Sequence, residues 1–221
     1  SLNLKAKVGN KHVRFDPNNK ISNIYKFNSH DLIKNELIQD LIMDPLLINI
    51  AGEYLESNPI FDFAAMWWST DSKILNDDAA QDFHFDLDRT NWLKIFIYLT
   101  DVNDKNGPHC YISGSHKVGN KPQESLNKGY VRISDKELLN FYNKKDFKEV
   151  TGKAGTILFG DTSCWHKGKP FVKGDRLILQ LEYTSSLFGL NTPNLKLENS
   201  SNKFRDFCKN NKFYSQNISL K

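Results

Sequence analysis

The chain has 221 residues, 39% of them hydrophobic and 25% charged, with a formal net charge of +4 at pH 7, so it can fold as one compact domain with a buried core. Acidic and basic residues are interspersed without a basic stripe, which argues against nucleic-acid binding. No apolar run has the length of a membrane-spanning helix and no charged-then-apolar leader opens the sequence, so we expect a cytoplasmic protein without a membrane span.

The first predicted elements along the chain are helices. Between about residues 31 and 55, apolar side chains recur at helical spacing, and Pro45 interrupts the pattern. Proline removes a backbone hydrogen bond and clashes with the preceding turn, so a helix normally ends before it. We therefore expect two consecutive helices here, packed against the outside of a barrel.

The chain from about residue 61 to 185 is mostly predicted to be β-strand. Apolar and alternating runs predict strands at 61–70, 92–102, 109–112, 155–160 and 176–183. A turn at 103–107 with Asn106-Gly107 predicts that the second and third of these strands form a hairpin. The sequence therefore predicts a mainly β fold with flanking helices.

Two further segments accompany the predicted barrel. Residues 118–153 break the strand pattern, and Ser134 and Glu137 form a capping box that predicts a helix through about Tyr142. This helical insertion can act as a lid or can be a plain surface excursion. The extension at 186–221 is polar and Asn-rich, with a short helix predicted near 203–209, and we expect it to cover a sheet edge. No repeat or linker divides the chain, so residues 1–221 are expected to form a single domain.

A pair of polar residues, His84 and Asp86, carries the first functional signal. Residues two apart in a strand point to the same side and lie roughly 7 Å apart, so both side chains can converge on one ion. A distant third ligand, His166, follows the strand at 155–160. Two histidines and one carboxylate form the facial triad that binds non-haem Fe(II) and leaves coordination positions open.

Other histidines and the cysteines compete for the same role. His109 and His116 are alternative third ligands, although a loop histidine such as His116 more often hydrogen-bonds the backbone. The three cysteines, at 110, 164 and 208, are odd in number and widely spaced. They indicate neither a disulfide framework nor a zinc site, and Cys164, two residues before His166, is expected to be a buried bystander.

Two stretches resemble a known family. From Phe83 to Lys117 the resemblance is carried by His84-Phe85-Asp86, Phe96 to Val102, Asn106-Gly107-Pro108 and Gly114-Ser115-His116-Lys117. From Gly155 to Tyr183 it is carried by Gly160-Asp161 before His166 and by Arg176, ten residues after it. In this order the motifs resemble the phytanoyl-CoA dioxygenase family.

The resemblance implies a fold, a metal and a cosubstrate. The fold would be a double-stranded β-helix, a jelly roll with a cupin-like barrel. Fe(II) would be held by His84, Asp86 and His166, and 2-oxoglutarate would chelate the iron while O2 takes the last position. Arg176 would bind the distal carboxylate of 2-oxoglutarate. The resemblance does not identify the primary substrate, nor does it argue for a CoA ester.

The residue physics agrees with the role implied for Arg176. A guanidinium offers a planar pair of donors that matches a carboxylate and stays charged at working pH. In an alternating strand from Arg176 to Tyr183, Ile178 and Gln180 share its face. The alternative is a surface ion pair with the neighbouring Asp175.

Second contacts for the cosubstrate depend on the orientation of strand 92–102. Lys94, Phe96 and Tyr98 occupy one face and Leu93, Ile95, Ile97 and Leu99 the other, and the sequence leaves open which face looks into the barrel. If the polar face points inward, Lys94 and Tyr98 become cosubstrate contacts. Otherwise both are exposed to solvent.

Residues on either side of the His-x-Asp pair also have two interpretations. Trp67, Trp68, Ser69 and Gln81 can wall a pocket or pack in the core. Asp88 and Arg89 can meet a polar substrate at the mouth of the site or form an exposed local salt bridge.

The sequence thus predicts an Fe(II)- and 2-oxoglutarate-dependent dioxygenase that hydroxylates an unactivated C–H bond of a small organic substrate, releasing succinate and CO2. Two alternatives stay open. A cupin-type metalloenzyme without 2-oxoglutarate would share the barrel, but it usually has His-x-His before a further Glu. A non-catalytic jelly-roll binding module gives no reason for His84, Asp86, His166 and Arg176 to coexist.

Overall fold

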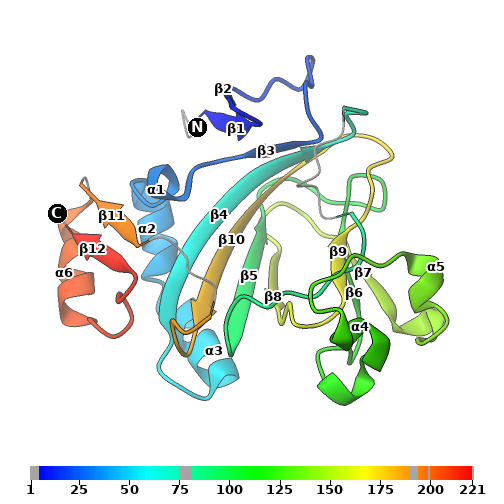
Figure 1. Ribbon diagram of the computed structural model, residues 1–221. Coiled ribbons are helices and arrows are strands. Elements are labelled where there is room, and N and C mark those ends of the chain that lie inside the picture. Colours follow the sequence, from blue (N-terminus) through cyan, green and yellow to red (C-terminus); the bar gives the residue numbers. More distant parts are fainter. Residues whose placement is uncertain (1–4, 75–80, 190–193, 199, 221) are drawn as a thin grey trace.

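Two antiparallel sheets that face each other form the body of the protein (Figure 1). The computed structural model describes residues 5–74, 81–189, 194–198 and 200–220. The larger sheet has the strand order β2-β1-β3-β4-β10-β5-β8. Its strands are β1 (Ala6–Val8), β2 (Lys11–Val13), β3 (Ile24–Lys26), β4 (Ile60–Thr70), β5 (Trp92–Tyr98), β8 (Ile157–Gly160) and β10 (Asp175–Thr184).

The smaller sheet consists of β7 (Phe147–Val150), β6 (His109–Ile112) and β9 (His166–Gly168), in that order. Isolated backbone bridges extend it, because His84 pairs with His166 and Phe83 pairs with Ile133. Two antiparallel sheets packed face to face, with helices on the outside, confirm the predicted jelly roll.

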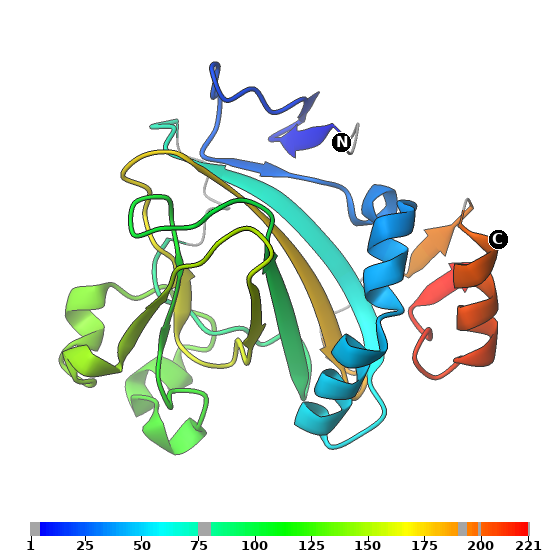
Figure 2. The same ribbon diagram turned by 180° about the vertical axis from the view of Figure 1, so that it is seen from behind.

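In the described part of the chain, three helices pack against the outer face of the larger sheet, where the sequence predicted two; Figure 2 shows them beside the sheet. They are α1 (Ser29–Leu32), α2 (Glu36–Ile42) and α3 (Pro45–Leu55). The extra boundary lies at Asn35, whose side chain accepts a hydrogen bond from the N–H of Leu37 and so caps a new helix. Asp44 caps α3 in the same way, and Pro45 occupies its first turn, where a missing N–H costs nothing. No helix in the described parts of the chain is long and apolar enough to span a membrane.

The inner and outer faces of β5 differ in what they contact. Leu93, Ile95 and Ile97 pack in the main hydrophobic cluster together with the helices, whereas Lys94 and Phe96 line a cavity between the sheets. The polar face of this strand therefore points into the barrel. Burial of the apolar face between sheet and helices fixes the register, since a shift by one residue would exchange the two faces.

The predicted hairpin between β5 and β6 is wrong. β5 pairs with β10 and β8, whereas β6 pairs with β7 and β9 in the other sheet. The turn at 103–107 instead carries the chain from one sheet to the other. Asn106 stabilises this crossover, because its Nδ2 donates to the carbonyls of Asp101 and Asp175.

The insertion at 118–153 contains short helices and one strand of the smaller sheet. Its helical pieces are η1 (Val118–Asn120), α4 (Gln123–Asn127), α5 (Asp135–Leu138) and η2 (Lys144–Asp146). Ser134 caps α5 by accepting from the N–H of Glu137, as predicted, but the helix ends at Leu138 and not near Tyr142. Since β7 also lies in this segment, the insertion is only partly helical.

The C-terminal extension comprises β11 (Leu195–Leu197), α6 (Asn202–Asn210) and β12 (Ile218–Leu220). It lies beyond α1 and α2, near the start of β4 (Figure 1). The N–H of Phe61 donates to the carbonyl of Tyr214 at 2.9 Å, and Asn217 Nδ2 donates to the carbonyl of Asp62 at 2.7 Å. β4 lies inside the sheet, but β3 pairs only with its residues 67–69, so these bonds reach the part of β4 that β3 leaves uncovered. The extension thus packs beside an interior strand and not along the edge strands β2 and β8.

Candidate metal centre and cosubstrate cavity

A cavity of about 460 Å³ lies between the two sheets. Its walls include all four residues predicted to hold the metal and the cosubstrate, namely His84, Asp86, His166 and Arg176. Trp67, Ser69 and Gln81 also line it. Trp68 points away, since its ring stacks on Phe15 with centroids 4.3 Å apart. The alternation of β4 therefore puts Trp67 in the cavity wall and Trp68 outside it.

The three predicted metal ligands come together in this cavity. Each offers one ligand atom, and these atoms all lie within 4.8 Å of one another. The Nε2 of His84 is 3.8 Å from Oδ1 of Asp86, and the Nε2 of His166 is 3.6 Å from Oδ2 of the same carboxylate. The expected alternation also holds, because Phe83 and Phe85 point to the other side, into a hydrophobic cluster. One metal ion could therefore contact both imidazole nitrogens and the carboxylate.

Backbone hydrogen bonds fix the position of the ligand-bearing segments. The N–H of His84 donates to the carbonyl of His166 at 3.0 Å, and the reverse bond measures 2.9 Å. The N–H of Asp86 donates to the carbonyl of Thr162 at 2.8 Å. Segments that are distant in the sequence are therefore held in a fixed register.

The orientation of both imidazoles is fixed by backbone carbonyls. Nδ1 of His84 lies 3.0 Å from the carbonyl of Asp82, and Nδ1 of His166 lies 3.0 Å from the carbonyl of Cys164. A carbonyl can only accept, so each Nδ1 donates this bond, and in the neutral form of such an imidazole the lone pair lies on Nε2. Hydrogen bonds of this kind orient histidines that bind metals.

Burial and neighbouring charges prepare the triad for a cation. Burial, above all, lowers the pKa of His166 to about 4, so its imidazole is neutral at neutral pH. Burial alone would raise the pKa of Asp86, but the positive charge of Lys94 and the nearby histidines outweigh it and lower that pKa to about 2. The site thus presents a neutral imidazole and an ionised carboxylate, the protonation states that metal binding requires.

Arg176 lies on the inner face of β10 together with Ile178 and Gln180, as predicted. Its guanidinium is buried, and burial lowers its pKa. Nη1 donates to the carbonyl of Gly107, while Nε has no hydrogen-bond partner among the residues that the structure describes. Asp175 does not pair with it but with Lys20, at 2.8 Å, so the surface ion pair is excluded. A buried guanidinium with a donor to spare is suited to bind a carboxylate.

Gly107 and Phe171 complete the surroundings of Arg176. Gly107 has φ +74°, and a Cβ at this position would overlap the ring of Phe171. That ring lies 5.9 Å from the guanidinium carbon of Arg176. Only glycine fits here without displacing the aromatic ring, because it tolerates positive φ and lacks a side chain.

The two residues expected to make second cosubstrate contacts have other partners. The hydroxyl of Tyr98 donates to the carbonyl of Val150 at 2.8 Å and accepts from the N–H of His109 at 3.1 Å. Tyr98 does not line the cavity. Lys94 does, but its ammonium contacts Asp86 and Asp88, each at 2.6 Å. Neither residue is placed to add a free donor for a ligand.

His109 is a cavity residue whose role the sequence did not reveal. It does not belong to the group of potential metal ligands, but its ring stacks on His166 with centroids 5.7 Å apart and lies 5.1 Å from the ring of Phe96. Burial, followed by the charges of His166 and Arg176, lowers its pKa well below the ordinary value. His109 thus lies as a neutral group beside His166, in the same cavity that Arg176 lines. His116 is exposed in its turn.

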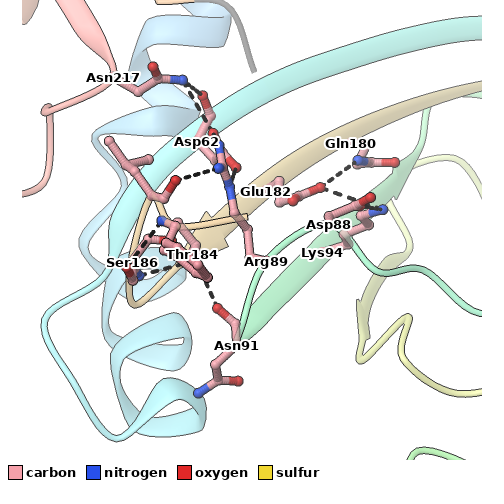
Figure 3. A network of polar contacts seen from close by, with 12 residues as sticks. Asp62, Asp88, Arg89, Asn91, Lys94, Gln180, Glu182, Thr184, Ser186 and Asn217 are labelled. Atoms are coloured by element: carbon pink, nitrogen blue, oxygen red, sulfur yellow. Dashed lines mark hydrogen bonds and ion pairs between the residues drawn. The ribbon is translucent and has the colours of Figure 1, made fainter. Parts of the chain in front are cut away.

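Both interpretations of Asp88 and Arg89 need correction. Arg89 is buried and forms a bidentate pair with Asp62, with Nε–Oδ2 and Nη2–Oδ1 distances of 2.7 and 2.8 Å (Figure 3). It is therefore neither at the mouth of the cavity nor part of an exposed salt bridge. Asp88 contacts Lys94. The neighbouring charges in the sequence do not predict this pair, because Asp62 lies in β4, 27 residues before Arg89.

Comparison with known proteins identifies the family to which this chain is similar. A family model described as phytanoyl-CoA dioxygenase matches residues 24–175. An ectoine dioxygenase of Bordetella bronchiseptica is 25% identical over 155 residues, which cover 61% of this chain and 48% of the relative. One of Bordetella parapertussis is 24% identical with the same coverage. The chain spans about half the length of the curated relatives it matches.

Several solved structures have a fold similar to that of this chain. HygX from Streptomyces hygroscopicus with nickel and 2-oxoglutarate bound has a TM-score of 0.53 and 19% identity, covering 83% of this chain and 77% of HygX. SnoN, a non-haem α-ketoglutarate-dependent epimerase from nogalamycin biosynthesis, has a TM-score of 0.50 and 16% identity, covering 73% and 61%. At these identities the similarity concerns the fold alone. Since the family model matches well over half of its residues, the chain belongs to the phytanoyl-CoA dioxygenase family.

Proposed function

We propose that the protein is an Fe(II)- and 2-oxoglutarate-dependent oxygenase that hydroxylates an unactivated C–H bond of a small organic molecule. The observation that carries this proposal is the presence of two binding elements in one cavity. His84, Asp86 and His166 converge within 4.8 Å, and Arg176 lines the same cavity with an Nε that has no hydrogen-bond partner among the described residues. A metal site alone would not need a buried guanidinium.

The donor set fits ferrous iron. Two imidazoles and one carboxylate are typical of non-haem Fe(II) oxygenases, whereas structural zinc sites are usually closed by four ligands. In this proposal His84, Asp86 and His166 are the protein ligands, and the remaining positions serve the cosubstrate and O2. The bound iron, together with the keto acid and O2, would supply the oxidising power for C–H cleavage.

The protein's own residues would bind and orient the reactants. Arg176 would hold the distal carboxylate of 2-oxoglutarate through its free Nε, with Gly107 and Phe171 fixing the guanidinium. A buried charge-assisted hydrogen bond is strong because little water competes for it. Phe96 and Ile178 line the cavity between the sheets, and such apolar walls exclude water from a reactive site.

The substrate is proposed to be a small molecule bound in the rest of the cavity. The curated relatives are named ectoine dioxygenases, and their chains are about twice as long as the part that matches. Ectoine is therefore one member of the panel of substrates to be screened. We also propose that residues 5–220 act as a single domain. Bonds from Tyr214 and Asn217 to β4 tie the C-terminal extension to the sheet.

Succinate formation from 2-oxoglutarate tests the proposed function. The protein, supplied with Fe(II), O2 and ascorbate, would be screened against amino acids, ectoine-like metabolites, sugars, lipids and natural-product intermediates. We expect succinate release that one substrate class stimulates, together with a product heavier by one oxygen atom. A cupin-type enzyme would turn over substrate without consuming 2-oxoglutarate, and a binding module would show no turnover.

A further inference from the structure

Lys94 has an unusual set of contacts at the base of the cavity. Its Nζ lies 2.6 Å from Oδ2 of Asp86, 2.6 Å from Oδ2 of Asp88 and 3.5 Å from Oε2 of Glu182. An ammonium group has three N–H donors. Hydrogen bonds to Asp86 and Asp88 use two of them, and Glu182 lies at ion-pair distance from the same nitrogen. The short contacts of Lys94 are therefore with acidic side chains of the protein.

Glu182 and Asp88 lie beside Lys94, and Gln180 lies next to Glu182 (Figure 3). Glu182 stands directly opposite Lys94 in the β10–β5 register and is fully buried. Gln180 Nε2 donates to Oε2 of Glu182 at 3.4 Å, and Asp88 approaches from the loop after the metal ligand. Because a lysine side chain is otherwise flexible, this enclosure fixes the ammonium where it contacts Asp86.

The contact with Lys94 gives the two oxygens of the Asp86 carboxylate different surroundings. Oδ2 accepts a short charge-assisted hydrogen bond from Lys94 and lies 3.6 Å from Nε2 of His166. Oδ1 lies 3.8 Å from Nε2 of His84 and accepts no hydrogen bond from an ammonium among the described residues. A carboxylate with one oxygen bound by an ammonium offers a cation mainly the other oxygen. Groups that bond a ligating carboxylate in this way orient it and tune the metal.

We propose that Lys94 is a positioning residue that restricts Asp86 to one coordinating oxygen and so keeps one iron position open for O2. This inference rests on the proposed function. Six positions are filled if two histidines, one carboxylate oxygen, the two oxygens of the keto acid and O2 bind together. A carboxylate that bound through both oxygens would take the position that O2 needs.

Nitric oxide tests the proposal, because it binds iron at the open position and gives an EPR signal without turnover. The wild type and Lys94→Met would be loaded anaerobically with Fe(II) and 2-oxoglutarate, and nitric oxide would be titrated. We expect Lys94→Met to lose about 10- to 100-fold in nitric oxide affinity. Its Fe(II) affinity should be equal or higher, because the competing ammonium is gone. If Lys94 only stabilised the fold, the variant would lose Fe(II) affinity as well as nitric oxide affinity.

A second variant covers the chance that Lys94→Met does not fold. Removing the ammonium leaves carboxylates buried together, which is destabilising, so Lys94→Met/Asp88→Asn removes one charge of each sign. Asp88→Asn alone keeps the Lys94–Asp86 contact. Lys20→Met is the matched control, since Lys20 also bridges two carboxylates, Asp71 and Asp175, outside the cavity. Unchanged nitric oxide affinity in both Lys94 variants would overturn the proposal.

A measurement on the wild type completes the test. In a crystal structure with Mn(II) and 2-oxoglutarate bound, Asp86 should contact the metal through one oxygen, with Lys94 on the other. Both carboxylate oxygens on the metal would refute the inference even if the variants cannot be prepared. Absence of any Fe(II) or 2-oxoglutarate binding in the wild type would contradict the proposed function instead, so the two failures are distinguishable.

Discussion

The guanidinium of Arg176 donates a hydrogen bond to the carbonyl of Gly107, 69 residues earlier in the chain. This bond joins the inner strand β10 to the loop that crosses from one sheet to the other. It uses Nη1 and leaves Nε without a partner in the described part of the chain. The same geometry therefore fixes the guanidinium and leaves it able to bind a ligand.

Replacing Arg176 should weaken cosubstrate binding without affecting the metal. A hydrogen bond to a charged group contributes on the order of 1.5 to 3 kcal/mol, so Arg176→Leu should lower 2-oxoglutarate affinity at least about tenfold. Arg176→Lys keeps the charge but loses the planar pair of donors, and should be intermediate. Isothermal titration of 2-oxoglutarate into the metal-loaded protein measures this affinity in both variants. Equal affinities in the wild type and Arg176→Leu would place the carboxylate anchor elsewhere.

Gly107→Ala tests whether the loop carbonyl positions Arg176. The added methyl group would overlap Phe171, and the positive φ of +74° adds backbone strain. We expect weaker 2-oxoglutarate binding with metal affinity close to that of the wild type. Gly9→Ala is the control, because Gly9 also has positive φ but open space around it. If both variants bound 2-oxoglutarate like the wild type, the contact with Phe171 would not matter.

Each of the three proposed metal ligands should be indispensable. His84→Ala, Asp86→Ala and His166→Ala each remove one of three protein donors, and loss of a group that only orients a metal-binding histidine already costs about 10- to 100-fold in affinity. We expect larger losses of Fe(II) affinity in these variants, with the fold retained by circular dichroism. His116→Ala, in an exposed turn, should bind iron normally. Loss of iron in His116→Ala with retention in His166→Ala would reverse the assignment.

Glu182 should make the metal-free protein less stable as the pH rises. Burial raises its pKa from 4.5 to about 8, against the lowering effect of Lys94. Between these values the unfolded chain releases a proton that the folded protein keeps, so the free energy of unfolding falls with increasing pH. Denaturant titrations across this range should give a flatter profile for Glu182→Gln than for the wild type. The exposed Glu124, replaced by Gln, serves as control; identical profiles in all three proteins would refute the prediction.

Local patterns predicted the elements, whereas long-range pairing decided their arrangement. The alternation in 92–102 identified β5, and the His-x-Asp spacing correctly placed two side chains on one side. The hairpin between β5 and β6 was wrong because a turn signal such as Asn106-Gly107 specifies a change of direction but not the partner strand. The partners of β5 are β10 and β8, far along the chain.

The same limit applies to the charges of the site. Lys94 was recognised as facing either the cavity or solvent, but its contacts include Glu182, on the paired strand β10. Arg89 likewise pairs with Asp62 rather than with the adjacent Asp88. A sequence shows which side chains share one face of a strand. Which side chain of the neighbouring strand lies opposite them depends on the pairing register, which only the folded sheet defines.

Anaerobic titration of 2-oxoglutarate into the Fe(II)-loaded protein tests whether one cavity holds both the metal and the cosubstrate. If the keto acid chelates iron held by His84, Asp86 and His166, a metal-to-ligand charge-transfer band should appear in the visible spectrum and saturate at one cosubstrate per protein. The band should need both components and should be lost in His166→Ala. A protein that binds Fe(II) tightly but gives no band at saturating 2-oxoglutarate would contradict the account.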